Sequence, residues 1–448
     1  MEQKLFYKSF FHFSSFLTDH SPRFGKWALD LATSSLYGNP QLIKMSFRLN
    51  GRRLQKIKRF ENILVIGDLN IGDAVNLQVS ISAIRNFFPK ANIDYIINRN
   101  ALNLVDGNPE ITRIWPVFAG SALPTDEDLE NVRQIMAMHS YDVIFNFCPF
   151  FKKNLLFAQT DNVINFFTLV SSFIRNERNR VPKNQVAYQT YLYLHHLLST
   201  SRPVEKREPF RGPRIYLSDV AIRQAQAFLR NHKIAQTESF IFLNPDANSR
   251  FTRIPLQTQI ELLRELIKFP NRILIGAGHK HKNIERELLN ALTPEQKEKI
   301  TVIPTTLPLD AYTALLDYAD IFISGDTGPL HLAAVRKVSR SGKHAFRNRT
   351  AVISVFGATA AHIYGYDSEK PGFIPAYQDA PSHAHIAGSP CRNITCINKM
   401  AKTCKQVRCF DSLDIAKICS DIRSHLAGHQ QENHKEVEKI KQNTAQII

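Results

Sequence analysis

Cysteine and glycine are scarce in this 448-residue chain, with 6 and 18 residues, and proline is not enriched, with 22. Six cysteines are too few for a disulfide framework, so the sequence predicts a reducing compartment. The few, scattered glycines and prolines exclude a collagen-like or low-complexity protein. No uninterrupted run of about 20 apolar residues occurs, so a membrane-spanning helix is not predicted. The best candidate, Phe166–Ile174, has half that length and is predicted to be a buried helix.

Acidic residues are also under-represented, with 40 Asp and Glu against 57 Lys and Arg, which gives a formal net charge of +17. Such an excess predicts an anionic partner, which could be nucleic acid, a phosphate-bearing small molecule or a membrane surface. Nucleic acid is disfavoured because the chain lacks the basic and aromatic motif of an RNA-binding module. The apolar content of 44% and charged content of 22% exclude a wholly disordered chain.

Short apolar runs alternate with helical patterns along most of the sequence. The pattern predicts a helix over Asp73–Phe88 and, in the first half, strands at Asn62–Gly67, Asn92–Ile97, Ile111–Val117 and Tyr141–Phe147. Strands that alternate with helices indicate a parallel sheet covered on both faces, which is an α/β fold.

The alternation stops at the proline-rich segment Thr200–Pro213, a predicted linker, and then starts again. The second half is predicted to contain helices at Pro255–Phe269, Ile284–Leu292 and Leu309–Tyr318. Its predicted strands are Ser239–Asn244, Arg272–Gly278, Ile300–Pro304, Ala319–Gly325 and Thr350–Gly357. Two such halves place a ligand cleft between the carboxyl ends of two sheets.

Neither glycine-containing turn matches a dinucleotide-binding loop. The first predicted strand leads into Gly67–Asp73 (GDLNIGD), which lacks G-x-G-x-x-G, and His281 stands where a third glycine should follow Gly276 and Gly278. A nicotinamide-dependent enzyme is therefore disfavoured. Asp73 is interpreted either as a helix N-cap or as a base whose ionised form the helix-end amides favour.

Two further loops carry polar residues from a strand into a helix. Ser324–His331 (SGDTGPLH) offers the amides of Thr327, Gly328 and Leu330 to an anion, with Asp326 and His331 beside them, or else is a tight turn with a core histidine. Asn244–Pro255 (NPDANSRFTRIP) carries arginines that suit phosphate oxygens.

These three loops, in this order, resemble glycosyltransferase family 9, the ADP-heptose:lipopolysaccharide heptosyltransferases of Gram-negative bacteria. The match consists of I-G-D (Ile71–Asp73) after the first strand, the N-P loop, and Asp326–Ala334 (DTGPLHLAA) followed by Val355–Thr359 (VFGAT). The resemblance covers residues 61 to about 425 and implies a GT-B fold, with two Rossmann-like domains facing across a cleft.

Composition and the resemblance together predict the domain order. Residues 1–60 are expected to form a basic, aromatic N-terminal extension, 61–200 the acceptor domain, 201–213 the linker, 214–428 the nucleotide-sugar donor domain and 429–448 a polar tail. The resemblance also implies an inverting reaction. Heptose passes from ADP-heptose to a lipopolysaccharide core acceptor at the cytoplasmic face of the inner membrane, with no obligatory cofactor.

The resemblance assigns roles residue by residue. Asp73 matches the catalytic base, and Asn70 and Gly72 lie in the acceptor-side loop. The remaining positions match the donor and diphosphate site, and they are Arg253, Glu285, Asp326, Thr327, Gly328 and His331.

Two family positions differ here, because Thr252 replaces a lysine and Gly67 replaces a basic residue. These departures leave a catalytically silent nucleotide-sugar-binding scaffold as an alternative function. Four cysteines are interpreted either as reduced structural cysteines or as a tetrahedral zinc or iron site, and they are Cys391, Cys396, Cys404 and Cys409. If they bind metal, they favour a second alternative, a protein O-heptosyltransferase.

The positive charge is concentrated in two segments. Residues 1–60 hold eleven Lys and Arg against three Asp and Glu, and the inserted segment Arg336–Arg349 holds six basic residues and no acidic ones. The insert is predicted to be a loop that emerges near the donor site. Both segments suit peripheral contact with an anionic membrane or a phosphorylated lipid acceptor.

Overall fold

The chain divides into two compact units, residues 1–213 and 214–448, here called the first and second units. The computed structural model describes residues 40–67, 71–118, 125–147, 162–165, 186–201, 210–278, 281–357, 359, 361–378, 380–387 and 407–428. The predicted helix Phe166–Ile174 and most of the predicted linker lie outside these residues.

The first unit contains one parallel sheet in the order β3-β2-β1-β4-β5. Its strands are β1 (Asn62–Ile66), β2 (Asn92–Asn98), β3 (Arg113–Phe118), β4 (Val143–Asn146) and β5 (Val163–Asn165). The predicted α/β alternation and the first-half strands are confirmed to within two residues at each end.

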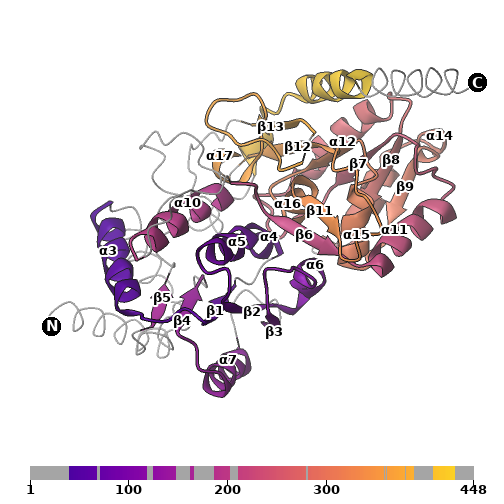
Figure 1. The fold of residues 1–448 in the computed structure, drawn as a ribbon. Coiled ribbons are helices and arrows are strands. Elements are labelled where there is room, and N and C mark those ends of the chain that lie inside the picture. Colours follow the sequence, from indigo (N-terminus) through magenta and orange to yellow (C-terminus); the bar gives the residue numbers. More distant parts are fainter. Residues whose placement is uncertain are drawn as a thin grey trace, which may run out of the picture. The chain divides into compact units, whose positions relative to one another are not determined.

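Helices connect and cover these strands (Figure 1). They are α3 (Pro40–Lys56), α4 (Ile71–Asn76), α5 (Gln78–Phe87), η1 (Arg99–Ala101), α6 (Leu102–Val105), α7 (Asp126–Met138) and α10 (Val186–Ser199). The single helix predicted over Asp73–Phe88 is wrong in detail, because the chain forms a separate turn at Leu77 between α4 and α5.

The second unit has a larger parallel sheet in the order β13-β12-β10-β7-β8-β9 and a separate pair, β11-β6. The strands are β6 (Arg214–Leu217), β7 (Phe240–Asn244), β8 (Arg272–Gly276), β9 (Ile300–Ile303), β10 (Ile321–Ser324), β11 (Arg336–Ser339), β12 (Ala351–Phe356) and β13 (Ser382–Ile386). The second-half strands predicted from the sequence are confirmed.

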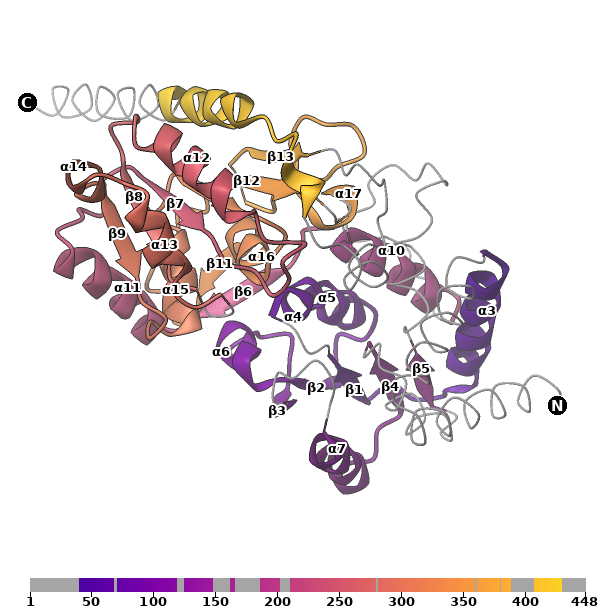
Figure 2. The same cartoon turned by 180° about the vertical axis from the view of Figure 1, so that it is seen from behind.

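Helices flank this sheet in both views of the molecule (Figures 1 and 2). They are α11 (Asp219–Asn231), α12 (Leu256–Leu266), α13 (Ile284–Asn290), α14 (Pro294–Lys297), α15 (Leu309–Leu316), α16 (Gly328–Ala334), α17 (Ala361–Tyr364), η2 (Arg408–Phe410) and a last helix over 415–428.

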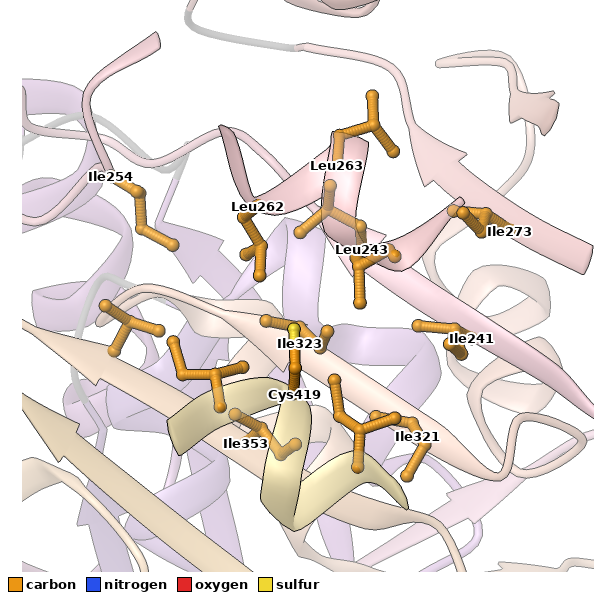
Figure 3. Close-up of a cluster of buried hydrophobic side chains, with 14 of the residues drawn as sticks. Ile241, Leu243, Ile254, Leu262, Leu263, Ile273, Ile321, Ile323, Ile353 and Cys419 are labelled. Atoms are coloured by element: carbon orange, nitrogen blue, oxygen red, sulfur yellow. The ribbon is translucent and has the colours of Figure 1, made fainter. Parts of the chain in front are cut away.

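Each unit has its own apolar core. In the second unit, alternate side chains of β7 and β10, such as Ile241, Leu243 and Ile323, pack against α12 and the last helix (Figure 3). In the first unit, Leu64 and Ile66 of β1 pack against α7. Burial of apolar surface at roughly 25 cal/mol per Å² is the main favourable contribution to the stability of both units.

Candidate active site

The polar loops of the second unit converge where its strand order reverses. Counted from β7, the order of the large sheet is 3-2-1-4-5-6, and the reversal lies between β7 and β10. In open α/β sheets, ligands bind outside the carboxyl ends of the strands at this position. Here the two carboxyl ends are Asn244 and Ser324, which are register partners.

Asn244 joins the loops that follow these two strands. Its side-chain nitrogen donates to the Asp246 carbonyl and to the Ser324 hydroxyl, both at 3.0 Å, and approaches the Thr327 hydroxyl at 3.4 Å. The Ser324 and Thr327 hydroxyls lie 2.9 Å apart. Because Asn244 is 7% exposed, these hydrogen bonds are shielded from water and fix the loops relative to each other.

A close backbone contact also joins the two loops. A Cβ at Gly325 would lie 2.3 Å from the Thr252 carbonyl oxygen, so only glycine allows this approach. The Thr252 hydroxyl donates to the Ser249 carbonyl at 3.1 Å within its own turn. Thr252, which replaces the family lysine, therefore contributes its backbone to the loop contact and no charge to the site.

Arg253 supplies a positive charge in this region. Its Nη1 lies 3.7 Å from Asp246 Oδ1, and the arginine side chain is 24% exposed. The Asp246 carboxylate also accepts the amide hydrogens of Ala247 at 2.8 Å and of His281 at 3.2 Å. Asp246 thus links the loops after β7 and β8, and the guanidinium keeps N–H donors for a phosphate.

Glu285 lies in the first turn of α13, beyond β8. Its Oε2 accepts the backbone amide of Gly278 at 3.2 Å. Gly278 must be glycine, because a Cβ would lie 2.1 Å from the His281 carbonyl oxygen. The structure places the predicted Glu285 at the same sheet edge as the other donor-site residues.

The turn after β10 partly fits its predicted role. Thr327 is the N-cap of α16, and Pro329 lies in its first turn. The Leu330 amide donates to the Thr327 carbonyl at 3.2 Å, which removes one of the three amides predicted to be open. Asp326 and Gly328 are half-buried at the tip of the turn.

His331 is placed differently from its predicted role as an anion ligand. The side chain is 5% exposed, and Nδ1 lies 2.8 Å from the Tyr366 hydroxyl. Burial lowers the pKa of His331 from 6.5 to about 4, so the ring is neutral at pH 7. A neutral imidazole brings no positive charge to a diphosphate, and the structure favours the core-histidine alternative.

In the first unit, the strand order reverses between β1 and β4. Gly67 follows β1 directly, and a Cβ there would lie 2.6 Å from the Tyr95 hydroxyl and 2.7 Å from its ring. The fully buried Tyr95 ring therefore fills the space that a side chain at position 67 would need. This packing is the physical reason for glycine at the position where the family has a basic residue.

Asp73 lies in the first turn of α4, which begins at Ile71, so its N-cap interpretation is wrong. An acidic residue in a first turn is still favoured by the helix dipole. Gly72 and Asp73 are half-buried, and Asn70 lies outside the described residues. The predicted base is therefore at the reversal point of the first unit's sheet.

The basic insert was predicted to be a loop near the donor site. The loop is confirmed for residues 340–349 and wrong for Arg336–Ser339, and the predicted location is wrong. The insert begins as β11, which pairs with β6, and it lies at the amino edge of the sheet. The Arg347 amide donates to Asp317 at 2.7 Å, and its Nη2 lies 3.4 Å from Asp320, just before β10. Lys337 is 2% exposed. Arg340 Nε donates to the Tyr216 carbonyl at 3.1 Å, so at least three of the six basic side chains are used within the fold.

The predicted cysteine site receives no support from the described residues. Cys391, Cys396 and Cys404 lie outside them, and Cys409 is 3% exposed within the apolar core of the second unit. Among the described residues, no group of three or more His, Cys, Asp or Glu side chains is arranged to hold a metal ion.

Sequence reasoning missed Asn244 and Asp246 as the residues that connect the loops. Asn244 was identified only as the first residue of the N-P loop. A polar residue at the end of a continuous apolar strand was the available signal. Tyr312, whose hydroxyl lies 3.4 Å from Asn244 Oδ1, gave none, because it lies within the helix α15.

Residues 133–400 match the profile of glycosyltransferase family 9 (heptosyltransferase). This chain belongs to glycosyltransferase family 9. A Haemophilus influenzae protein provisionally named as a glycosyltransferase is 21% identical over 291 residues, which is 63% of this chain and 82% of that protein.

Solved structures of family-9 proteins share the fold. A glycosyltransferase family 9 protein from Veillonella parvula superposes with a TM-score of 0.61 at 15% identity, covering 82% of this chain and 98% of its own. The ADP-heptose lipopolysaccharide heptosyltransferase II of E. coli gives a TM-score of 0.55 at 16% identity, with 82% and 99% covered. The predicted GT-B fold class is confirmed, and the chain is a glycosyltransferase.

In the part of the chain that the structure describes, no helix has the length and apolar character needed to cross a bilayer.

Proposed function

We propose that this family-9 enzyme transfers heptose from ADP-heptose to a lipopolysaccharide core acceptor, with inversion at the anomeric carbon. One observation carries the proposal: the N-P and D-T-G-P loops, which are 80 residues apart, are joined through Asn244 at the reversal point of the second unit's sheet. That edge is where a nucleotide binds in this class of fold.

Arg253 and the turn at Thr327 and Gly328 are the proposed diphosphate contacts. As the bond between the anomeric carbon and the diphosphate oxygen breaks, negative charge grows on the leaving ADP. Donors that are already in place stabilise this charge without having to reorganise. Glu285 is proposed to hold the ribose.

Asp73 is the proposed base. It takes the proton of an acceptor hydroxyl as that oxygen attacks the anomeric carbon, so the new glycosidic bond forms while ADP leaves. Removing a general base typically lowers the rate by about 10²–10⁴-fold. The Asp73→Ala variant is expected to lose turnover by this factor and to keep its ADP affinity.

The test measures ADP release from ADP-heptose in the presence of heptose-deficient core lipid. Asp126→Ala is the matched control, because Asp126 is an exposed acid in the first turn of α7 in the same unit. Full activity of Asp73→Ala would overturn the base assignment, and no ADP release by the unaltered chain would overturn the donor or the acceptor.

The packing of Tyr95 against Gly67 favours a second candidate, a donor-binding protein without turnover. Gly67 and Thr252 stand at two positions where the family has basic residues, so two positive charges are missing here. This candidate would be supported if calorimetry shows ADP binding and no heptose is transferred to lipid or protein acceptors. Transfer to a protein serine would instead support the O-heptosyltransferase alternative.

A further inference from the structure

The exposed face of α3 carries a row of positive charges. Arg48, Arg52 and Lys56 are exposed and spaced four residues apart, which places them along one side of the helix at intervals of about 6 Å. Lys58 and Arg59, just beyond the helix, are also exposed. We call Arg48, Arg52 and Lys56 the α3 stripe.

The opposite face of α3 is attached to the first unit. Leu54 is fully buried and Asn50 is 4% exposed. The Phe47 ring stacks on His196 of α10, with ring centroids 5.0 Å apart, and Arg53 Nη1 donates to the Val163 carbonyl at 2.9 Å. Both views show α3 beside α10 (Figures 1 and 2). The helix is therefore held in place with its stripe facing outward.

No acidic residue neutralises the stripe along the chain, since residues 31–60 contain no Asp or Glu. Within the described residues, no ion pair involves any of the three side chains. A fixed, uncompensated row of cations on a helix favours a surface that presents many negative charges at once.

We propose that the α3 stripe docks the enzyme on an anionic lipid bilayer. The adjoining segment favours lipid over nucleic acid, because residues 1–39 contain nine Phe, Tyr and Trp, and basic segments that lie on a bilayer bury such apolar and aromatic side chains at the headgroup boundary. The apolar face of α3 packs on its own unit, so the stripe contributes electrostatic attraction to lipid headgroups. This inference rests on the proposed function, because transfer to a lipid-borne acceptor requires the enzyme to lie at a membrane.

The test is co-sedimentation of the full chain with vesicles of phosphatidylcholine mixed with phosphatidylglycerol. Each basic residue near an anionic surface strengthens binding by about fivefold, so the variant R48Q/R52Q/K56Q is expected to bind roughly a hundredfold more weakly. Binding by the unaltered chain is expected to fall as salt is added.

The matched control is K90Q/R230Q/K233Q, which removes the same charge from exposed positions in both units, outside the two basic segments. The control variant should bind vesicles nearly as well as the unaltered chain. Both variants should unfold at the same temperature as the unaltered chain. Equal binding by the stripe variant would overturn the proposal, as would equal losses in both variants or tighter binding to a DNA duplex than to the vesicles. The assay involves no turnover, so failure of the proposed transfer reaction would leave its result unchanged.

Discussion

The two units share a strand order around their reversal points but differ in the contacts described at the carboxyl ends of β1 and β7. In the second unit, a buried amide, two hydroxyls and a backbone contact at Gly325 tie the loops after β7 and β10 together. In the first unit, a tyrosine ring packs against Gly67 at the end of β1. Among the described residues, the second unit thus brings buried polar groups together at this position, while the end of β1 packs against an aromatic side chain.

The largest expected effects come from the two glycines. Gly325→Ala forces a Cβ against the Thr252 carbonyl, and overpacking of this kind costs about 1–3 kcal/mol or more. Gly67→Ala forces a Cβ against a side chain instead. A second change, Tyr95→Val, should therefore restore part of the stability lost in Gly67→Ala, whereas Thr252→Ala should restore nothing to Gly325→Ala.

Urea unfolding checks this difference. Gly428→Ala serves as the control, because a Cβ there meets no atom within 4 Å. Trp115 lies in β3 of the first unit, so its fluorescence follows that unit while circular dichroism follows both. If the second substitution restores stability to both glycine variants, or to neither, the proposed distinction between the units is wrong.

Acid should act on the second unit through His331. Its pKa is about 4 when folded and 6.5 as the ordinary value, so the unfolded chain binds the proton first as the pH falls. The contribution of His331 to the free energy of unfolding is fully present above pH 6.5, and it declines by about 3 kcal/mol toward pH 4. His385, whose pKa burial also lowers to about 4, acts in the same direction.

The measurement is urea unfolding at a series of pH values for the unaltered chain and for His331→Phe. The variant loses the Tyr366 contact at every pH, so the informative quantity is the slope of stability against pH, which should become shallower. An unchanged slope would contradict the buried, neutral state of His331.

A smaller effect is expected when the asparagines at the two reversal points are compared. Asn244→Leu leaves buried hydroxyls and a carbonyl with fewer partners, which costs about 2 kcal/mol. It should also weaken ADP binding, because the two donor loops lose their link. Asn146→Leu, at the end of β4 and fully buried, should destabilise the first unit and leave ADP affinity unchanged. Calorimetry with ADP measures both affinities. Equal losses of ADP affinity in the two variants would contradict a specific role for the link between the second unit's loops.

Much of the fold could be predicted from the sequence. Continuous apolar runs such as Asn62–Ile66 and Phe240–Asn244 predict buried parallel strands, because only strands covered on both faces are apolar throughout. The turn at Leu77 and the strand β11 could not be predicted in this way. β11 depends on pairing with β6, more than a hundred residues earlier, and local sequence carries no record of such a partner.

The sequence by itself determined the family, the α/β class and the loops that carry the polar residues, because these follow from local motifs and periodicity. Only the tertiary structure decided which of those residues meet. It joined Asn244 to Ser324 and Thr327, placed His331 in the core beside Tyr366, and placed the basic insert at the sheet edge opposite the loops after β7 and β10. Strand order and packing bring distant segments together, and these set the charge of His331 and the surroundings of Lys337.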